Sequence, residues 1–112
     1  MGSEMCIRDS SDRSLRHACF SACQEELDEV RLAQPVIFMI QCALVELLKT
    51  WGVHADCVVG HSSGEVAAAY ACGALSLADA TRLVFHRATL QQRVAGSGRM
   101  LAVGLDLSLI HI

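Results

Sequence analysis

The sequence predicts an α/β fold in which parallel strands pack against helices, and three observations support this prediction. A short apolar run, Cys57–Val59, leads into the motif Gly60–Glu65 and then into an alanine-rich run that favours a helix. Helical apolar periodicity precedes this unit and resumes after it. A second strand-like run, Met100–Val103, lies near the carboxyl end. Helix, strand, turn, two helices and strand is the order of an α/β layered fold.

The first long helix is expected to begin near Pro35, since proline suits the first turn of a helix. Gly52 is placed to end it. Between them, apolar residues recur with the 3.6-residue period of a helix at Ile37, Ile40, Leu44, Leu47, Leu48 and Trp51. Residues 11–33 are polar and mixed, and they include an acidic stretch that we expect to be a solvated helix face or loop: Glu25, Glu26, Asp28 and Glu29.

Two shorter helices are expected further along the chain. The first runs from about Ser63 to Cys72, where Gly73 stops it. Ser76 and Asp79 then resemble a capping box in which aspartate replaces the usual glutamate. The helix that follows carries apolar residues at Leu77, Ala80, Leu83, Val84, Ala88 and Val94.

The motif Gly60–Glu65 gives the strongest indication of chemistry. Its residues fit the pattern G-x-S-x-G, and a strand before it with a helix after it is the context of a nucleophile elbow. Gly60 and Gly64 would allow a sharp turn and close packing around the serine. Ser62 is therefore a candidate nucleophile, with the positive end of the next helix near any oxyanion formed there. The alternative is a chance match, because this pattern also occurs in loops rich in glycine and serine.

Composition limits the class of protein. The chain has 112 residues, of which 53% are hydrophobic and 19% charged, which is typical of one small globular domain. The apolar excess is high for this length, and we infer that further chain covers part of it. A net charge of -3 with no basic cluster argues against nucleic-acid binding. The apolar run from Pro35 to Leu48 is too short and too polar to cross a bilayer, and no signal peptide is recognised.

The six cysteines indicate reduced thiols in a cytoplasmic protein. Their spacing matches no zinc-binding or C-x-x-C pattern, so no metal site is predicted. Cys42, Cys57 and Cys72 lie in apolar contexts, where a free cysteine behaves as a small hydrophobic residue.

The two ends of the chain suggest one DNA element read in opposite orientations. Residues 5–10 can be encoded by ATGTGTATAAGAGACAG and one further base. The reverse complement of that element encodes residues 107–112. We therefore expect residues 1–10 and 107–112 to derive from a sequencing adaptor, and residues 11–106 to be a fragment of a domain.

Seven short phrases occur in order along the chain: Gln34-Pro35, Trp51-Gly52-Val53, Val59 to Glu65, Ala67 to Tyr70, Gly73 to Leu77, His86-Arg87, and Gly98 to Val103. This ordered set resembles the malonyl-CoA:acyl-carrier-protein transacylase family, found as acyltransferase domains in type I polyketide synthases and fatty acid synthases. The resemblance covers about residues 27–105.

The resemblance implies an incomplete α/β-hydrolase-like core that transfers acyl groups in two steps. Ser62 would attack the thioester of an acyl-CoA, and the phosphopantetheine thiol of an acyl carrier protein would then take the acyl group. The backbone N–H of Ser63 would be one oxyanion donor. His61, Gly60 and Gly64 would line or support the pocket, without a bound cofactor. Neighbouring synthase domains such as a ketosynthase are the implied partners.

Arg87 is implied to bind the free carboxylate of a malonyl or methylmalonyl group. A planar guanidinium can hold a carboxylate through two parallel hydrogen bonds. The resemblance also implies that Ser63, the residue after the nucleophile, lines the acyl pocket. A serine there is compatible with malonyl, and the choice between malonyl and methylmalonyl stays open. The alternative for Arg87 is a surface arginine, the interpretation given to Arg82, Arg93 and Arg99. His54 and His86 are interpreted as structural, and Glu65 as stabilising the positive end of a helix.

Parts of the family pattern have no match in this chain. These are the downstream general-base histidine, the upstream Gly-Gln-Gly motif and the inserted ferredoxin-like subdomain. We therefore expect the chain alone to be catalytically inactive, because serine without its base is a poor nucleophile. Two other functions stay open. One is a serine esterase or thioesterase of another α/β-hydrolase type, which would not explain Arg87, and the other is a non-enzymatic interaction fragment.

Overall fold

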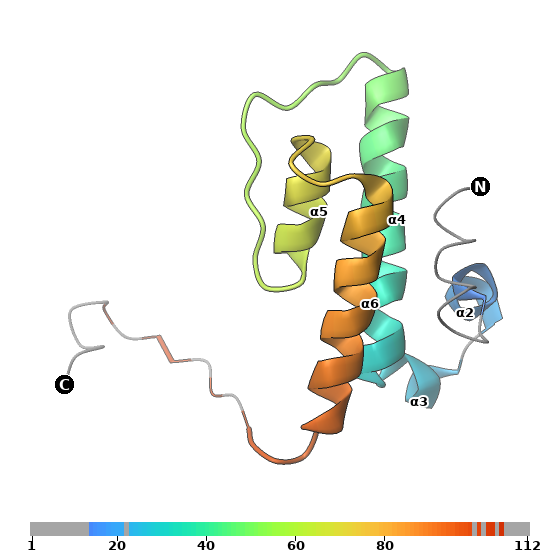
Figure 1. The fold of residues 1–112 in the computed structure, drawn as a ribbon, viewed down its shortest axis with the longest axis vertical. Helices are drawn as coiled ribbons and strands as arrows, with labels where there is room; N and C mark the ends of the chain where they lie inside the picture. Colours follow the sequence, from blue (N-terminus) through green and yellow to red (C-terminus); the bar gives the residue numbers. More distant parts are fainter. Residues whose placement is uncertain (1–13, 22, 100, 102, 105, 107–112) are drawn as a thin grey trace.

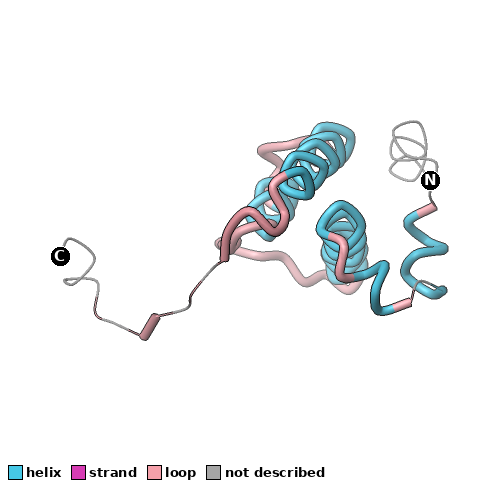
Figure 2. Tube along the Cα trace, turned by 90° about the horizontal axis from the view of Figure 1, so that it is seen from below, coloured by secondary structure: helices cyan, strands magenta, loops and turns pink. Residues whose placement is uncertain are grey.

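The computed structural model describes residues 14–21, 23–99, 101, 103, 104 and 106, and no strand forms among them (Figure 2). Their helices are α2 (Leu15–Ser21), α3 (Gln24–Leu27), α4 (Val30–Thr50), α5 (Gly64–Ala71) and α6 (Leu77–Arg93) (Figure 1). The two ends attributed to an adaptor, residues 1–10 and 107–112, lie outside this described part.

Helix α4 is the centre of the fold. Helix α6 lies antiparallel to it, and the shorter α5 packs against both of them (Figure 1). Apolar side chains from these three helices form the main buried cluster: Phe38, Cys42, Val66, Ala67, Ala80 and Val84. At the other side of α4, the amino-terminal helix α2 contributes to a second buried cluster: Leu15, Ala18, Leu32 and Val36. The polar and mixed segment therefore supplies part of a core through Leu15 and Ala18, while none of the four residues of its acidic stretch is buried.

Helix α4 is longer than the sequence predicts, since it begins at Val30 and holds Pro35 inside. The periodic apolar set that predicted the helix lies on its exposed face, with Leu44 52% and Trp51 69% exposed. A different set is buried within this chain: Leu32, Pro35, Val36, Phe38 and Cys42. The helix is thus apolar on two faces, and this chain covers one of them.

The length of α4 also changes the membrane argument. By length and composition alone, its 21 residues could cross a bilayer. The sequence argument against a membrane span used only Pro35 to Leu48, which is shorter than the helix that forms. The core helix of a folded domain meets the same criterion. We assign α4 that role because it contacts α2, α3, α5 and α6.

The predicted helix ends are confirmed. Gly52 has φ 75° after α4, and Gly73 has φ 78° after α5. In the first case the Gly52 N–H donates to Lys49 O and the Val53 N–H donates to Leu48 O, both at 3.0 Å. This pair of hydrogen bonds is a Schellman motif, in which glycine adopts the left-handed conformation without a steric penalty.

At the start of α6, one of the two hydrogen bonds of the predicted capping box is present. The hydroxyl of Ser76 accepts a hydrogen bond from the Asp79 N–H at 3.1 Å. Asp79 accepts from that same hydroxyl at 2.6 Å, where a complete capping box would have its carboxylate bind the backbone of the cap residue.

The strand predicted at Cys57–Val59 is wrong for this chain, and the α/β class is not observed among the described residues. Residues 53–60 are extended but irregular, because a strand needs a neighbouring strand for its backbone hydrogen bonds. Open grooves of about 390 and 680 Å³ separate this segment from α4 and α5. At the second predicted strand, Leu101 and Val103 have no regular structure, while Met100 and Ala102 lie outside the described residues.

The cysteines of the described part are free thiols. Cys42 is buried, as its apolar context predicted, and its burial, reinforced by the nearby Glu46 carboxylate, raises its pKa to about 11. Cys57 and Cys72 are exposed instead. Both border the groove beside residues 53–58, where no described chain covers them.

Candidate functional site

The turn that carries Ser62 has an unusual backbone. Ser62 is the non-glycine residue of the described part with positive φ, at 55°. This conformation is uncommon for residues with a Cβ and marks turns that hold a side chain in a fixed direction. The His61 carbonyl accepts from the Gly64 N–H at 2.9 Å, and the Ser62 carbonyl accepts from the Glu65 N–H at 3.2 Å. These bonds join the turn to the first residues of α5.

The two glycine positions of the motif differ in whether they could accept a larger side chain. A Cβ at Gly60 would lie 2.4 Å from Gly64 O and 2.5 Å from Glu65 N, both of them backbone atoms. Gly60 is therefore needed where the incoming chain crosses the start of α5. At Gly64 the nearest atom would be Gln41 Nε2 at 3.8 Å, an ordinary contact. The close packing expected of both glycines is present at Gly60 alone.

Arg87 and Ser62 lie side by side, although they are 25 positions apart in the sequence. Arg87 Nη2 donates a hydrogen bond to Ser62 Oγ at 3.3 Å. Ser62 is exposed and Arg87 is half-buried on α6. The packing of α5 against α6 therefore brings a hydroxyl on a tight turn within reach of a guanidinium.

Two glutamines hold Arg87 from its other side. Gln34 Oε1, on α4, accepts a hydrogen bond from Arg87 Nη1 at 2.5 Å. Gln91 Oε1, one turn further along α6, accepts from the same nitrogen at 3.4 Å and also from Gln34 Nε2. Sequence reasoning did not identify Gln91 as a site residue. The signal for it was its i+4 spacing from Arg87, which places both on one face of α6.

The remaining predicted site residues surround the turn. The Ser63 N–H donates to no acceptor in the described part of the chain. His61, Ser63 and Gly64 line the groove of about 680 Å³ beside α4 and α5, which neither Ser62 nor Arg87 lines. Glu65 lies in the first turn of α5, where its negative charge favours the helix. Arg82 forms an exposed ion pair with Asp79 at 3.6 Å, as expected for a surface arginine.

A polar contact fixes α5 to α4 and so supports the turn. The Tyr70 hydroxyl donates to Glu46 Oε1 at 2.7 Å, and Lys49 Nζ donates to the same oxygen at 2.8 Å. These hydrogen bonds, that from Lys49 first, lower the pKa of Glu46. Burial, together with the hydrogen bond to Glu46, raises the pKa of Tyr70 to about 12. The tyrosine therefore stays a donor at neutral pH.

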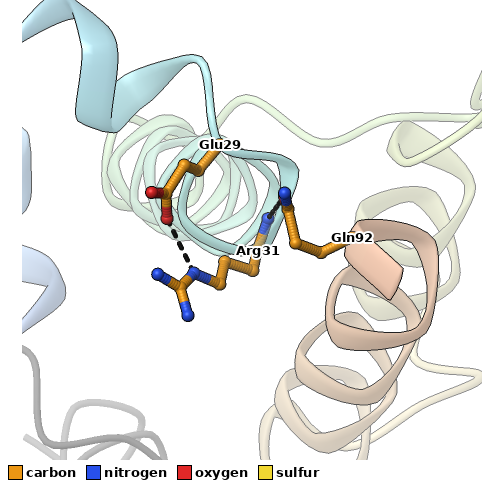
Figure 3. Close-up of polar contacts among 3 residues, drawn as sticks. All are labelled: Glu29, Arg31 and Gln92. Atoms are coloured by element: carbon orange, nitrogen blue, oxygen red, sulfur yellow. Dashed lines mark hydrogen bonds and ion pairs between the residues drawn. The ribbon is translucent and has the colours of Figure 1, made fainter. Parts of the chain in front are cut away.

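A separate contact joins the start of α4 to the end of α6. The Arg31 N–H, in the first turn of α4, donates to the Gln92 side chain at 3.3 Å (Figure 3). The Arg31 side chain turns away from it and pairs with Glu29 at 2.7 Å, which raises the pKa of Arg31. Successive glutamines on α6 thus have separate partners: Gln91 faces Arg87, and Gln92 faces the start of α4.

Comparison with known proteins agrees with the resemblance in the sequence. Residues 2–111 match the model of a family described as "Acyl transferase domain". "Probable polyketide synthase 44" of Dictyostelium discoideum is 48% identical over 80 residues, which are 71% of this chain and 3% of that protein. "Polyketide synthase GfsA" of Streptomyces halstedii is 46% identical over 90 residues, 80% of this chain and 1% of that protein.

"Mycoketide-CoA synthase" of Mycobacterium tuberculosis is 51% identical over 77 residues, which are 69% of this chain and 2% of that protein. The chain thus spans a few per cent of the length of these curated relatives. The family match, in contrast, extends over nearly the whole chain. The chain belongs to the acyl transferase domain family.

Proposed function

We propose that this chain is the nucleophile-bearing part of an acyltransferase domain in a polyketide or fatty acid synthase. In this proposal the domain loads a malonyl or methylmalonyl unit from CoA onto an acyl carrier protein. The observation that supports it best is the 3.3 Å contact between Arg87 Nη2 and Ser62 Oγ. The positive φ of Ser62 adds the backbone strain expected where a nucleophile is held on a strand-to-helix turn.

The chemistry follows from these two groups. Ser62 Oγ attacks the thioester carbonyl, its proton passes to a base, and CoA leaves as the thiol. The carrier-protein thiol then attacks the serine ester and regenerates the hydroxyl. The N–H of Ser63 would stabilise the oxyanion in both steps. We assign His61 to the pocket wall. We place the general base in a part of the domain that lies outside this chain, and we therefore propose that the isolated chain is inactive.

Arg87 accounts for the proposed substrate class. In a malonyl ester, one carbon separates the carbonyl from the free carboxylate, so that carboxylate lies close to Ser62. A guanidinium beside the hydroxyl can bind it in a bidentate manner. A monocarboxylic acyl group has no such anion and leaves the guanidinium unpaired. A general esterase has no use for this contact, which favours the transacylase over that alternative.

The test compares Arg87→Ala with Arg82→Ala in the complete acyltransferase domain that contains this chain. Hydrogen bonds to charged groups contribute about 1.5–3 kcal/mol, so kcat/KM for malonyl-CoA should fall roughly 10- to 100-fold in Arg87→Ala. Transfer from acetyl-CoA should be unchanged or faster. Arg82→Ala, which alters only an exposed ion pair, should change neither.

Equal losses with both thioesters would refute the carboxylate-binding role. The isolated chain provides a second arm of the assay, where we expect no acylation of Ser62. Stoichiometric, Ser62-dependent acylation of the isolated chain would contradict the placement of the base outside it.

A further inference from the structure

Arg87 is held by uncharged groups. Its Nη1 donates to Gln34 Oε1 at 2.5 Å and to Gln91 Oε1 at 3.4 Å, in a half-buried position. No carboxylate pairs with it in the described part of the chain, where the arginine ion pairs involve Arg31 and Arg82. Amide oxygens satisfy guanidinium donors without neutralising the charge. The arginine thus keeps its full positive charge for an incoming anion.

The two amides can be oriented in one way only. Arginine has donors and no acceptor, so each glutamine must present its oxygen to Arg87. Gln34 Nε2 then has to find an acceptor, and Gln91 Oε1 is that acceptor. Gln91 therefore prevents the Gln34 amide from turning its nitrogen toward the guanidinium, where two donors would repel each other.

The same arrangement directs the rest of the guanidinium. With Nη1 occupied by the two amides, Nη2 is the nitrogen directed at Ser62 Oγ. The hydrogen bonds of the Gln91 side chain in the described part of the chain go to Gln34 and Arg87, and not to Ser62. Any effect on the reaction has to pass through Arg87.

We propose that Gln91 is a positioning residue that holds Arg87 directed at Ser62 without neutralising its charge, and so sets the preference for acyl groups that end in a carboxylate. This inference rests on the proposed function. It assigns substrate discrimination to an uncharged side chain that does not touch the substrate. A glutamate at the same place would keep the acceptor but pair with Arg87 and compete with the substrate carboxylate.

The experiment measures kcat and KM for malonyl-CoA and acetyl-CoA in the complete acyltransferase domain carrying Gln91→Glu, Gln91→Leu or Gln92→Glu. In Gln91→Glu we expect the malonyl-to-acetyl ratio of kcat/KM to fall roughly 10- to 100-fold, mainly through KM. Gln91→Leu should lower the ratio less, because it loosens Arg87 without adding charge. Gln92→Glu is the matched control, since Gln92 contacts the Arg31 N–H and not Arg87.

An unchanged ratio in Gln91→Glu, or an equal fall in Gln92→Glu, would overturn the role of Gln91. Retained acetyl transfer shows that a variant is folded, and Gln91→Glu keeps the side-chain shape should Gln91→Leu misfold. The Arg87→Ala variant separates the two proposals. A loss of malonyl transfer there, without any effect of Gln91→Glu, would reject this inference and leave the proposed function standing. No loss in Arg87→Ala would reject the substrate class itself.

Discussion

Replacement of Gly60 by alanine tests whether the turn geometry depends on close contact with α5. The added Cβ would lie 2.4 Å from Gly64 O, 2.5 Å from Glu65 Cα and 2.5 Å from Glu65 N. All three atoms belong to the backbone, so rotation of a side chain cannot relieve the clash. The turn and the helix would have to separate by about 1 Å to reach ordinary van der Waals contact.

The size of this shift sets the expected effect. Overpacking of a close contact costs about 1–3 kcal/mol of folding stability. A displacement of about 1 Å in a reacting group can lower the rate roughly 100-fold. The 3.3 Å contact between Ser62 Oγ and Arg87 Nη2 would be stretched beyond hydrogen-bonding distance. A roughly 100-fold loss in rate corresponds to about 2.7 kcal/mol, so Gly60→Ala should lower catalysis and stability by comparable free energies.

Thermal unfolding followed by circular dichroism measures the stability, and acylation by malonyl-CoA in the complete domain measures the rate. Gly64→Ala is the control, because its Cβ meets no atom closer than 3.8 Å. It should change the free energy of unfolding by less than about 0.5 kcal/mol. A Gly60→Ala variant as stable and active as the parent would refute the reasoning, as would an equal loss in Gly64→Ala.

Two further predictions concern stability. Ser76→Ala should destabilise the chain by about 1 kcal/mol, since it removes the hydroxyl that caps α6, whereas Ser97→Ala outside the helices should have little effect in the same thermal melts. An unchanged melting temperature in Ser76→Ala would count against the cap. The raised pKa of Cys42, about 11 against an ordinary 9.0, means that the folded chain keeps a proton which the unfolded chain loses first. Stability should therefore fall as the pH rises from about 9 toward 11, and less steeply in Cys42→Ala; parallel pH profiles would contradict this.

Local signals in the sequence predicted what local forces determine. Gly52 and Gly73 end helices because their left-handed backbone favours glycine, and Ser76 begins one because its hydroxyl can accept a backbone hydrogen bond. These effects act within a few residues and need no other part of the fold. The helices that follow α4 were therefore predicted to within about one residue.

Features that depend on distant chain were predicted poorly. Cys57–Val59 has the composition of a strand, yet it is irregular where no neighbour pairs with it. On α4 the strongest apolar period marks the exposed face, because periodicity does not say which face this chain covers. In the site, the sequence indicated Ser62 through its G-x-S-x-G motif and Arg87 through a family resemblance. It gave no sign that Gln34 would meet Gln91, 57 positions away, because only the pairing of α4 with α6 brings them together.

That pairing has a consequence for recombination between genes that encode acyl transferase domains. Gln34, Arg87 and Gln91 are joined by hydrogen bonds between α4 and α6 and within α6. These two helices run antiparallel (Figure 1). A crossover between Gln34 and Arg87 would separate Gln34 from Arg87 and Gln91, which would stay together on α6 from one parent. Exchange of the whole stretch from α4 to α6 would transfer the arginine with its neighbours intact. Chimeric enzymes cut outside that stretch should inherit their choice of acyl group more faithfully than those cut within it.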